Sequence, residues 1–464
     1  MDLSSRLRAI VKSGPPKSPP PALSERDGHA SRRELTYEPD TGRYEATMDV
    51  SQVAALLGGR PADTPFGRCL IVDRRYEADR WHGGIRIGDC EVDDPASLSI
   101  LDPTLRGQTP SGELRTFPRT IFIDLETTGL SGGAGTVAFL VGCGFFDLGA
   151  FQVRQFLLTS HSAERALLWA VADFFEGADL IVTYNGKTFD VPVMETRWLF
   201  HRLQMPLESV PHFDMLHPAR RLWRPRFAAI DADEGGCRLG TLERTLFNVT
   251  RVGDVGGFEI PGRFFRFLRN GDPRPLEAVL EHNRLDLVSL AAVMARAMEL
   301  ARSGHAACRD CSEALALGRI YERAAAEDRP DVRERVLAHA ESCYRRGAES
   351  RTAEVKAEAL YRLGLWHRRE RRFVEAAAIW REVLDLTEPK GVRRIAGMRA
   401  LRQFAAEALA IHHEHRDRDL DSARELALFA LEDADGRRAD GMRHRLARLD
   451  RKIAKKTDAQ LLWS

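Results

Sequence analysis

Apolar and polar positions divide the chain into three regimes. The middle regime, from 119 to about 302, holds short apolar runs bounded by turn residues, together with longer stretches that have apolar residues at helical spacing. The part before it has short alternating runs between turns, and the part from about 312 is helical almost throughout. Because 464 residues are too many for one ordinary core, we expect two or three domains.

The middle regime predicts a mixed sheet covered by helices. The helix at 162–177 should open with Ser162 as a cap and Glu164 in its first turn. Three strands, then a helix, a strand and a helix are typical of such a sheet. The predicted strands lie at 120–126, 135–147, 150–158 and 179–185, and the predicted helices at 162–177, 189–203 and 275–301.

The last third carries a weak internal repeat. A stretch around 357–389 matches the tetratricopeptide pattern, and 317–347 and 422–433 resemble divergent copies of it. Small residues at these positions let paired helices pack closely, and stacked pairs share a core. We therefore expect an all-α solenoid at 312–464. The pattern positions are Leu360, Leu363, Gly364, Ala376, Trp380, Val383 and Pro389.

The first regime divides at about residue 38. The segment 1–38 is rich in Pro, Ser and charge, which predicts a disordered stretch. Residues 39–115 suggest a small β-rich lead-in whose role the sequence does not indicate, and the α/β domain is expected at 116–304.

The amino-acid composition is typical of a soluble globular protein. Hydrophobic residues make up 44% and charged residues 30%, which is ordinary for a soluble globular protein. The net charge of +1 gives no global attraction to nucleic acid, so any such contact must come from local clusters. Seven irregularly spaced cysteines favour a reducing compartment, and the apolar runs are too short to span a bilayer. We expect a cytoplasmic protein that does not contact a membrane.

Two acidic residues interrupt the first predicted strand of the sheet. Asp124 and Glu126 lie two positions apart, so their side chains point to the same face, with Leu125 on the other. Two ionised carboxylates so close repel each other unless a positive charge lies between them. A divalent cation would supply it, and oxygen ligands favour Mg²⁺ or Mn²⁺. A solvated strand face is the alternative.

Two further stretches add acids that could converge with this pair. Asp190 opens a predicted helix directly after a strand and a loop, where it could equally be a helix cap. His282 and Asp286 lie four residues apart and hence on one face of the long helix. Asp286 stands between two leucines, which is an unusual place for an acid without a ligand. His282 could also be a satisfied histidine beside such a site.

The three stretches together resemble a known superfamily. "FIDLETTGL" (122–130), "YNGKTFD" (184–190) and "HNRLD" (282–286) are similar to the three motifs of the DEDD nucleases, an RNase H-like group of 3′–5′ exonucleases. The sequence between them and the helical third resemble the bacterial YprB-type proteins of that group. The resemblance covers about 119–302 well and the last third loosely. It implies an α/β fold, an RNase H-like mixed sheet flanked by helices, followed by the tetratricopeptide-like solenoid.

The resemblance implies a nuclease that hydrolyses phosphodiester bonds with two Mg²⁺ or Mn²⁺ ions. Asp124, Glu126, Asp190 and Asp286 would bind the ions, and His282 would be the general base. His282 departs from the superfamily pattern, in which a His lies five positions before the last Asp and a Tyr four positions before it. The expected substrate is DNA or RNA, as single strands or 3′ ends.

Other candidate residues are weaker, and each has a structural alternative. Thr127, Thr128 and Gly129 could meet the 3′ end of a strand or form a plain turn, and Asn185 could hold its loop. A run at 218–227 interleaves arginines with Trp223 and Phe227, which favours a stacking track or a solvated helix face. The candidate substrate contacts are Thr127, Thr128, Gly129, Asn185, Lys187, Arg220 and Arg221.

Two other classes of function stay open. The fold could serve as a non-catalytic scaffold that binds nucleic acid or protein, or the helical repeats could dock a protein partner. Within the enzyme class, a structure-specific endonuclease could use the same metal site.

Overall fold

The computed structural model describes residues 49–91, 94–108, 119–129, 135–227, 237–326, 330–387, 396–432, 434 and 436–461. The segment 1–38, which the sequence predicts to be disordered, lies outside them. The first part of the chain forms α2 (Val50–Leu57), β1 (Arg60–Thr64), β2 (Gly67–Glu77), β3 (Trp81–His82), β4 (Ile85–Arg86), η1 (Ile87–Cys90), α3 (Pro95–Leu101) and η2 (Pro103–Gln108).

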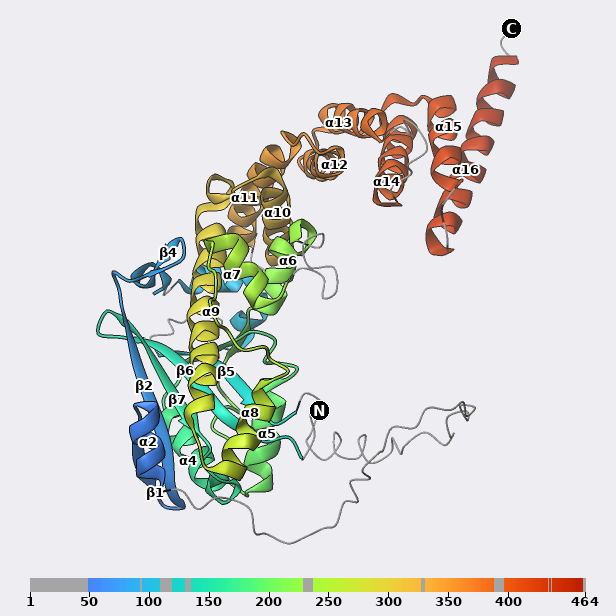
Figure 1. Cartoon of the computed structure of the whole chain (residues 1–464). Coiled ribbons are helices and arrows are strands. Elements are labelled where there is room, and N and C mark those ends of the chain that lie inside the picture. Colours follow the sequence, from blue (N-terminus) through green and yellow to red (C-terminus); the bar gives the residue numbers. More distant parts are fainter. Residues whose placement is uncertain are drawn as a thin grey trace, which may run out of the picture. The chain divides into compact units, whose positions relative to one another are not determined.

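The predicted mixed sheet is confirmed, and helices flank it (Figure 1). Its strand order is β1-β2-β7-β6-β5-β8-β9; β8 and β9 run parallel to β5, and the other neighbours pair antiparallel. The remaining elements of this part are β5 (Thr120–Thr127), β6 (Ala138–Asp147), β7 (Ala150–Leu157), η3 (His161–Ala163), α4 (Glu164–Phe175), β8 (Leu180–Thr183), α5 (Asp190–Phe200), β9 (His212–Asp214), α6 (Leu216–Phe227), α7 (Leu239–Phe247), α8 (Ile260–Asn270), η4 (Arg274–Leu276) and α9 (Glu277–Ser303).

The predicted lead-in contributes to this same sheet. β2 pairs along its length with β7, from Leu70 opposite Leu157 to Glu77 opposite Ala150, and β1 forms the edge beyond it. The sequence pattern predicted a β-rich lead-in but could not show that β2 pairs with a strand some 80 residues further along the chain.

Strand β5 separates two layers of core. Ile121, Ile123 and Leu125 pack in the cluster that contains α4 and α5, whereas Phe122 packs in the cluster that contains most of α9. Asp124 and Glu126 therefore lie on the α9 side, since side chains alternate along a strand. Helix α9 contacts β5, β6 and β7 and crosses the sheet in Figure 1.

The expected cap of the helix at 162–177 is wrong. Ser162 makes no cap hydrogen bond, and its hydroxyl lies 2.9 Å from that of Ser160. Glu164 is buried and binds Arg197 of α5 through two contacts, of which Nε–Oε1 is 2.5 Å. Glu164, which the local pattern placed at the start of the helix, thus forms an ion pair with a residue of another helix.

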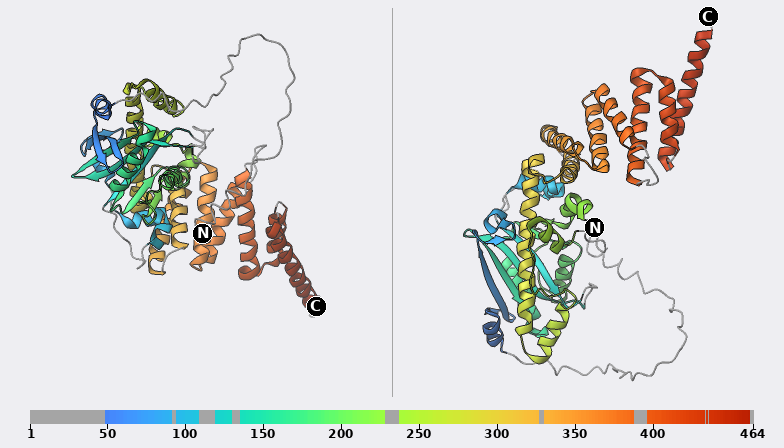
Figure 2. Two further views of the ribbon diagram at one scale, coloured as in Figure 1. Left: turned by 90° about the horizontal axis from the view of Figure 1, so that it is seen from below. Right: turned by 45° about the horizontal axis from the view of Figure 1, so that its top comes forward.

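The last third is helical, as predicted. Successive helices pack against one another, and Figure 2 shows them side by side. That they are tetratricopeptide repeats stays a prediction. Within the described residues, no helix is both long and apolar enough to cross a membrane. The elements are η5 (Gly304–Ala307), α10 (Cys311–Ala326), α11 (Pro330–Ala348), α12 (Ala353–Arg369), α13 (Phe373–Leu386), α14 (Ala396–His412), η6 (His413–Asp417), α15 (Leu420–Leu431) and α16 (Gly436–Leu461).

We expect Gly364→Ala to destabilise this helical region, because Gly364 of α12 lies directly against Trp380 of α13. A Cβ at Gly364 would lie 2.1 Å from the indole Nε1, and overpacking of this kind costs about 1–3 kcal/mol. Gly441 of α16 is the matched control, since nothing lies within 4 Å of its Cβ position. Gly441→Ala should be neutral or stabilising by about 0.5–1 kcal/mol. Urea unfolding measures both, and equal stabilities would contradict the packing.

Candidate active site

The four predicted acids come from three elements. Asp124 and Glu126 lie on β5, Asp190 is the first residue of α5, and Asp286 lies in the first half of α9. The negative charges of Asp190 and Asp286 act on both acids of β5. A backbone hydrogen bond from Leu125 to the Asp190 carboxylate places α5 directly against β5. The sheet and the two helices thus bring the four side chains into one electrostatic cluster.

Burial and mutual repulsion make three of these carboxylates, Asp124, Glu126 and Asp190, difficult to ionise. Loss of water, then the charges of Asp286 and its neighbours, raise the pKa of Asp124 well above its usual range and that of Glu126 to about 9. Burial likewise raises the pKa of Asp190 to about 7, although backbone hydrogen bonds oppose the rise. At neutral pH the cluster therefore needs positive charge to hold all its acids ionised.

Asn283 of α9 positions Asp124. Its Nδ2 donates to the Asp124 Oδ2 at 2.8 Å and to the Asp124 carbonyl at 3.1 Å, while its Oδ1 accepts from Gln155 Nε2 at 2.7 Å. Gly142, opposite Asp124 on β6, makes room for this side chain, since a Cβ there would lie 2.1 Å from the Asn283 Oδ1. Neither residue belongs to the predicted site, although Asn283 directly follows His282.

The loop at 248–259 adds a cation to the cluster. Arg251 binds Glu243 of α7 through Nε at 2.7 Å and Nη2 at 2.8 Å, and its Nη2 lies 2.6 Å from the Asp286 Oδ1. Its Nη1 also lies 3.3 Å from the Asp254 Oδ2. Burial opposes its charge, but Asp286 and Glu243 outweigh burial and raise the Arg251 pKa. No local pattern could have indicated these contacts, because they join segments distant in sequence.

His282 lies between two carboxylates. Its Nδ1 is 2.7 Å from the Asp254 Oδ1, and its Nε2 is 3.4 Å from the Asp286 Oδ2. Partial burial would raise the pKa of Asp254, but the hydrogen bond from His282 outweighs it and lowers the pKa. Asp254 therefore fixes the orientation of the imidazole, a role that no sequence pattern around Asp254 indicates.

A buried hydrogen-bond chain joins this cluster to the lead-in. The Ser289 hydroxyl of α9 donates to Glu243, and His82 Nε2 of β3 lies 2.9 Å from the same hydroxyl. Burial lowers the pKa of His82 to about 4, so the ring is neutral at physiological pH. Residues of the lead-in thus support the partners of Arg251.

The turn after β5 is internally hydrogen-bonded. Thr127 Oγ1 donates to the Gly129 carbonyl at 2.9 Å, and Thr128 Oγ1 accepts from the Val137 N–H at 3.0 Å. Both hydroxyls therefore have structural partners, while Gly129 has open space around its Cβ position.

The loop between β8 and α5 is held by Asp214 at the end of β9. The backbone N–H groups of Asn185 and Lys187 donate to its two carboxylate oxygens at 2.8 and 3.1 Å. Asn185 has φ of 70°, and its Oδ1 accepts from Thr188. The Lys187 Nζ lies 3.5 Å from the Asp102 Oδ2. The loop is therefore held by Asp214 through its backbone and by Asp102 through the side chain of Lys187.

The predicted stacking track on α6 is wrong for its tryptophan. Trp223 is fully buried and donates from Nε1 to Glu313 at 2.9 Å. The helical periodicity of α6 did not show whether its aromatic residues pack in the core or stack on nucleic-acid bases. Arg220 is exposed, and Arg221 is half-buried with Nη1 3.4 Å from the Leu101 carbonyl. The side chain of Phe227 lies outside the described residues.

The donor set fits a hard divalent cation by its chemistry. Carboxylate oxygens are the ligands that Mg²⁺ and Mn²⁺ prefer, and among the described residues no cation acts on Asp124 or Glu126, whose pKa values are raised. In the part of the chain that the structure describes, no three His, Cys, Asp or Glu side chains are already arranged around one metal position. Asp286 instead binds Arg251.

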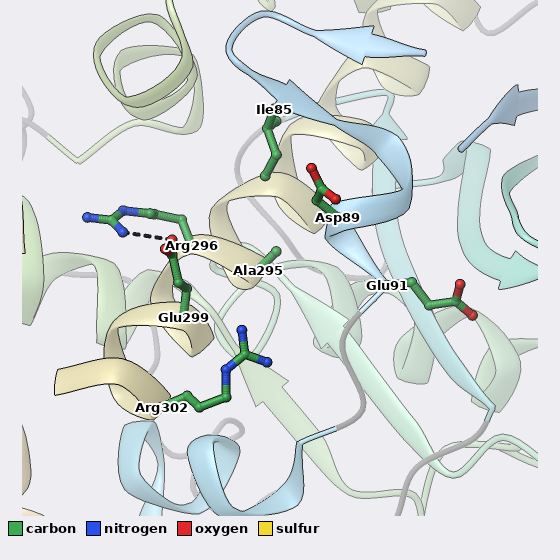
Figure 3. Close-up of a pocket in the computed structure, with 7 residues that line it drawn as sticks. All are labelled: Ile85, Asp89, Glu91, Ala295, Arg296, Glu299 and Arg302. Carbon is green, nitrogen blue, oxygen red and sulfur yellow. Dashed lines mark hydrogen bonds and ion pairs between the residues drawn. The ribbon is translucent and has the colours of Figure 1, made fainter. Parts of the chain in front are cut away.

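A surface pocket of about 460 Å³ lies elsewhere, between the lead-in and the C-terminal half of α9 (Figure 3). None of the four acids lines it. Arg296 and Glu299 form an ion pair of 2.8 Å at its wall. Its lining residues are Ile85, Asp89, Glu91, Ala295, Arg296, Glu299 and Arg302.

Comparison with known proteins agrees with this architecture. Residues 121–298 match the model of the RNase_H superfamily (RNase_H_2). Over this region the sheet with its flanking helices is therefore similar to the RNase H-like class, which supports a function in nucleic-acid processing.

More of the chain matches one particular protein. It is 28% identical over 396 residues to "Uncharacterized protein YprB" of Bacillus subtilis (strain 168), which covers 83% of this chain and 86% of that protein. The predicted resemblance to YprB-type proteins is thus confirmed. A similar solved structure is the family B DNA polymerase from the hyperthermophilic archaeon Pyrobaculum calidifontis, at 13% identity and a TM-score of 0.29. That match covers 44% of this chain and 29% of the polymerase.

Proposed function

We propose that this protein is a metal-dependent nuclease, a 3′–5′ exonuclease that acts on single strands of DNA or RNA. The observation that carries the proposal is the electrostatic cluster of Asp124, Glu126, Asp190 and Asp286 on an RNase H-like fold. Crowded carboxylates in a partly buried site cost free energy. A pair of divalent cations would remove this cost.

The four acids would bind two Mg²⁺ or Mn²⁺ ions, which when bound activate a water and stabilise the leaving 3′ oxygen. Asn283 would hold Asp124 in place for this role. His282 would accept the proton of the water at its Nε2, which lies 3.4 Å from the Asp286 Oδ2, while Asp254 occupies its Nδ1. For Asp286 to bind an ion, its ion pair with Arg251 would have to break, or Asp286 would have to bind both partners.

Several residues near the cluster would contact the strand. Thr127 ends β5 and Thr128 and Gly129 follow it, while Asn185 and Lys187 precede Asp190. The loop that carries Arg251 and Asp254 also exposes Val252 at 95% and Phe258 at 84%. Exposed aromatic rings stack on unpaired bases, which supports a preference for single strands. Arg220 and Arg221 would meet phosphates further along.

The Arg251–Asp286 ion pair favours a second candidate function. If the pair is permanent, the fold would serve as a non-catalytic scaffold for nucleic acid or protein. Calorimetric titration with Mn²⁺ separates the two, because a scaffold of this kind would bind no ion at the carboxylates. Docking of a protein partner by the helical third and a cytoplasmic location also stay predictions.

The test is a cleavage assay with the purified chain and end-labelled strands and duplexes of DNA and RNA, in Mg²⁺ and in Mn²⁺. We expect the 3′ end of single strands to be shortened stepwise and Asp124→Ala to abolish the activity. Internal cuts would instead indicate an endonuclease. Equal cleavage by wild type and Asp124→Ala at equal purity would refute the mechanism.

A further inference from the structure

A buried carboxylate organises cations at the C-terminal end of the helical region. Glu414 follows α14, and its side chain is inaccessible to solvent. It accepts from Arg445 Nη1 at 2.6 Å, Arg448 Nε and Nη2 both at 2.8 Å and Lys452 Nζ at 2.8 Å. Burial opposes its ionisation, but these hydrogen bonds lower the Glu414 pKa to about 2. Three cations of α16 are thus held close together around one charge.

A groove of about 410 Å³ opens beside Glu414. Within the described residues, its exposed cations Arg418 and Lys456 make no hydrogen bond or ion pair with their side chains. The nearby acid Asp417 lies against His412 and His413, and Asp419 caps α15 through Ser422. We call this feature the C-terminal basic groove; its lining residues are Glu414, Arg418, Leu420, Lys452 and Lys456.

The charge of the groove is local. The whole chain has a net charge of +1, yet five cations surround the single carboxylate of Glu414. Three of the eight lysines of the chain fall within 452–456. Over α16, nine Lys and Arg residues stand against three Asp. Such a surface attracts a polyanion and holds it less tightly as salt rises.

We propose that the C-terminal basic groove binds the phosphate backbone of the nucleic acid that the carboxylate cluster processes, as a second contact remote from that cluster in sequence. The choice of nucleic acid as ligand rests on the proposed function. The groove offers Leu420 as its one apolar lining residue, whereas a peptide partner needs apolar anchors in its interface core. Backbone phosphates need only cations.

The test measures binding of the full chain in EDTA, where no strand is cut, to labelled single strands of about 30 nucleotides, in DNA and RNA arms. Arg418→Ala with Lys456→Ala should raise Kd about five- to tenfold at low salt. It should also lower the slope of log Kd against log salt by about 1.4, the value for two lost contacts to a single strand.

The matched control removes the same charge elsewhere. Arg323 and Arg369 are exposed on α10 and α12, and Arg323→Ala with Arg369→Ala should leave Kd and slope unchanged. Arg418→Lys with Lys456→Arg should restore binding, which separates charge from folding.

Wild-type Kd and slope in the Arg418→Ala, Lys456→Ala variant would overturn the proposal, and so would binding of polyglutamate without binding of the strands. If the groove binds strands but no strand is ever cut, the nuclease proposal fails and the groove stands. If cleavage requires Asp124 but the groove variant binds normally, the reverse holds.

Discussion

Glu126→Gln is expected to abolish nuclease activity while making the metal-free protein more stable at alkaline pH. The loss of activity should exceed about a hundredfold, since even outer contacts to a metal ligand are worth about 10–100-fold. The gain in stability has a separate cause. The fold raises the pKa of Glu126 from 4.5 to about 9, so stability present at acid pH is lost as pH rises between these values. Glutamine carries no charge and removes that loss.

Thermal melts in EDTA at pH 6 and pH 8.5 check the second effect. After allowance for solvent screening, we expect a gain of about 1–3 kcal/mol at the higher pH and a smaller one at the lower. Mn²⁺ should stabilise the wild type more at the higher pH and should have less effect on the variant. Glu208, an exposed acid in the same domain, provides the control, and Glu208→Gln should change neither melt nor activity. A less stable Glu126→Gln protein in EDTA would contradict the electrostatic account.

Asn283→Ala is expected to lower both stability and activity. Asn283 is fully buried and donates to Asp124 while accepting from Gln155. Its removal takes the donor away from the Asp124 carboxylate and leaves Gln155 Nε2 with the Leu280 carbonyl alone, at a cost of about 1–3 kcal/mol. Activity should fall about 10–100-fold, because a partner that orients a metal ligand is lost. Urea unfolding and the cleavage assay measure the two effects.

Gly142→Ala turns this expectation into a double-mutant cycle. The added Cβ would lie 2.1 Å from the Asn283 Oδ1 and should displace that side chain, at a cost of about 1–3 kcal/mol. In the Asn283→Ala background the clash is absent, so the second change should cost little. Gly240→Ala on α7 is the control, with nothing within 4 Å of its Cβ position. Additive effects of Gly142→Ala and Asn283→Ala would show that the two residues do not act together.

Local periodicity was sufficient to predict which side chains of the candidate site share a face of one strand or one helix. The period of a strand placed Asp124 and Glu126 on one face, and the period of a helix placed His282 and Asp286 on another. Each of these pairs is separated by a fixed spacing, so the sequence alone specifies their relation. Their convergence with Asp190 was inferred from the three stretches together, which also resemble the motifs of the DEDD nucleases. Metal binding by these acids stays a prediction.

What the sequence could not show depends on contacts between distant segments. Arg251 reaches Asp286 across 35 positions, and Asn283 reaches Asp124 across 159. Neither partner has a signature in its own neighbourhood. The stacking role predicted for Trp223 was wrong for a related reason, because its ring is buried by the packing of α6 against α10, where it contacts Glu313.

Strand β2 affects how this protein can be divided. The match to the RNase_H superfamily begins at residue 121, but β1 and β2 lie at 60–77 and cover the free side of β7. A fragment trimmed to the matched region would leave β7 as a bare edge, with a row of backbone N–H and C=O groups open to pairing. Unprotected edges of this kind join those of other molecules and aggregate. The self-contained unit for expression therefore starts well upstream of residue 121, where the match begins.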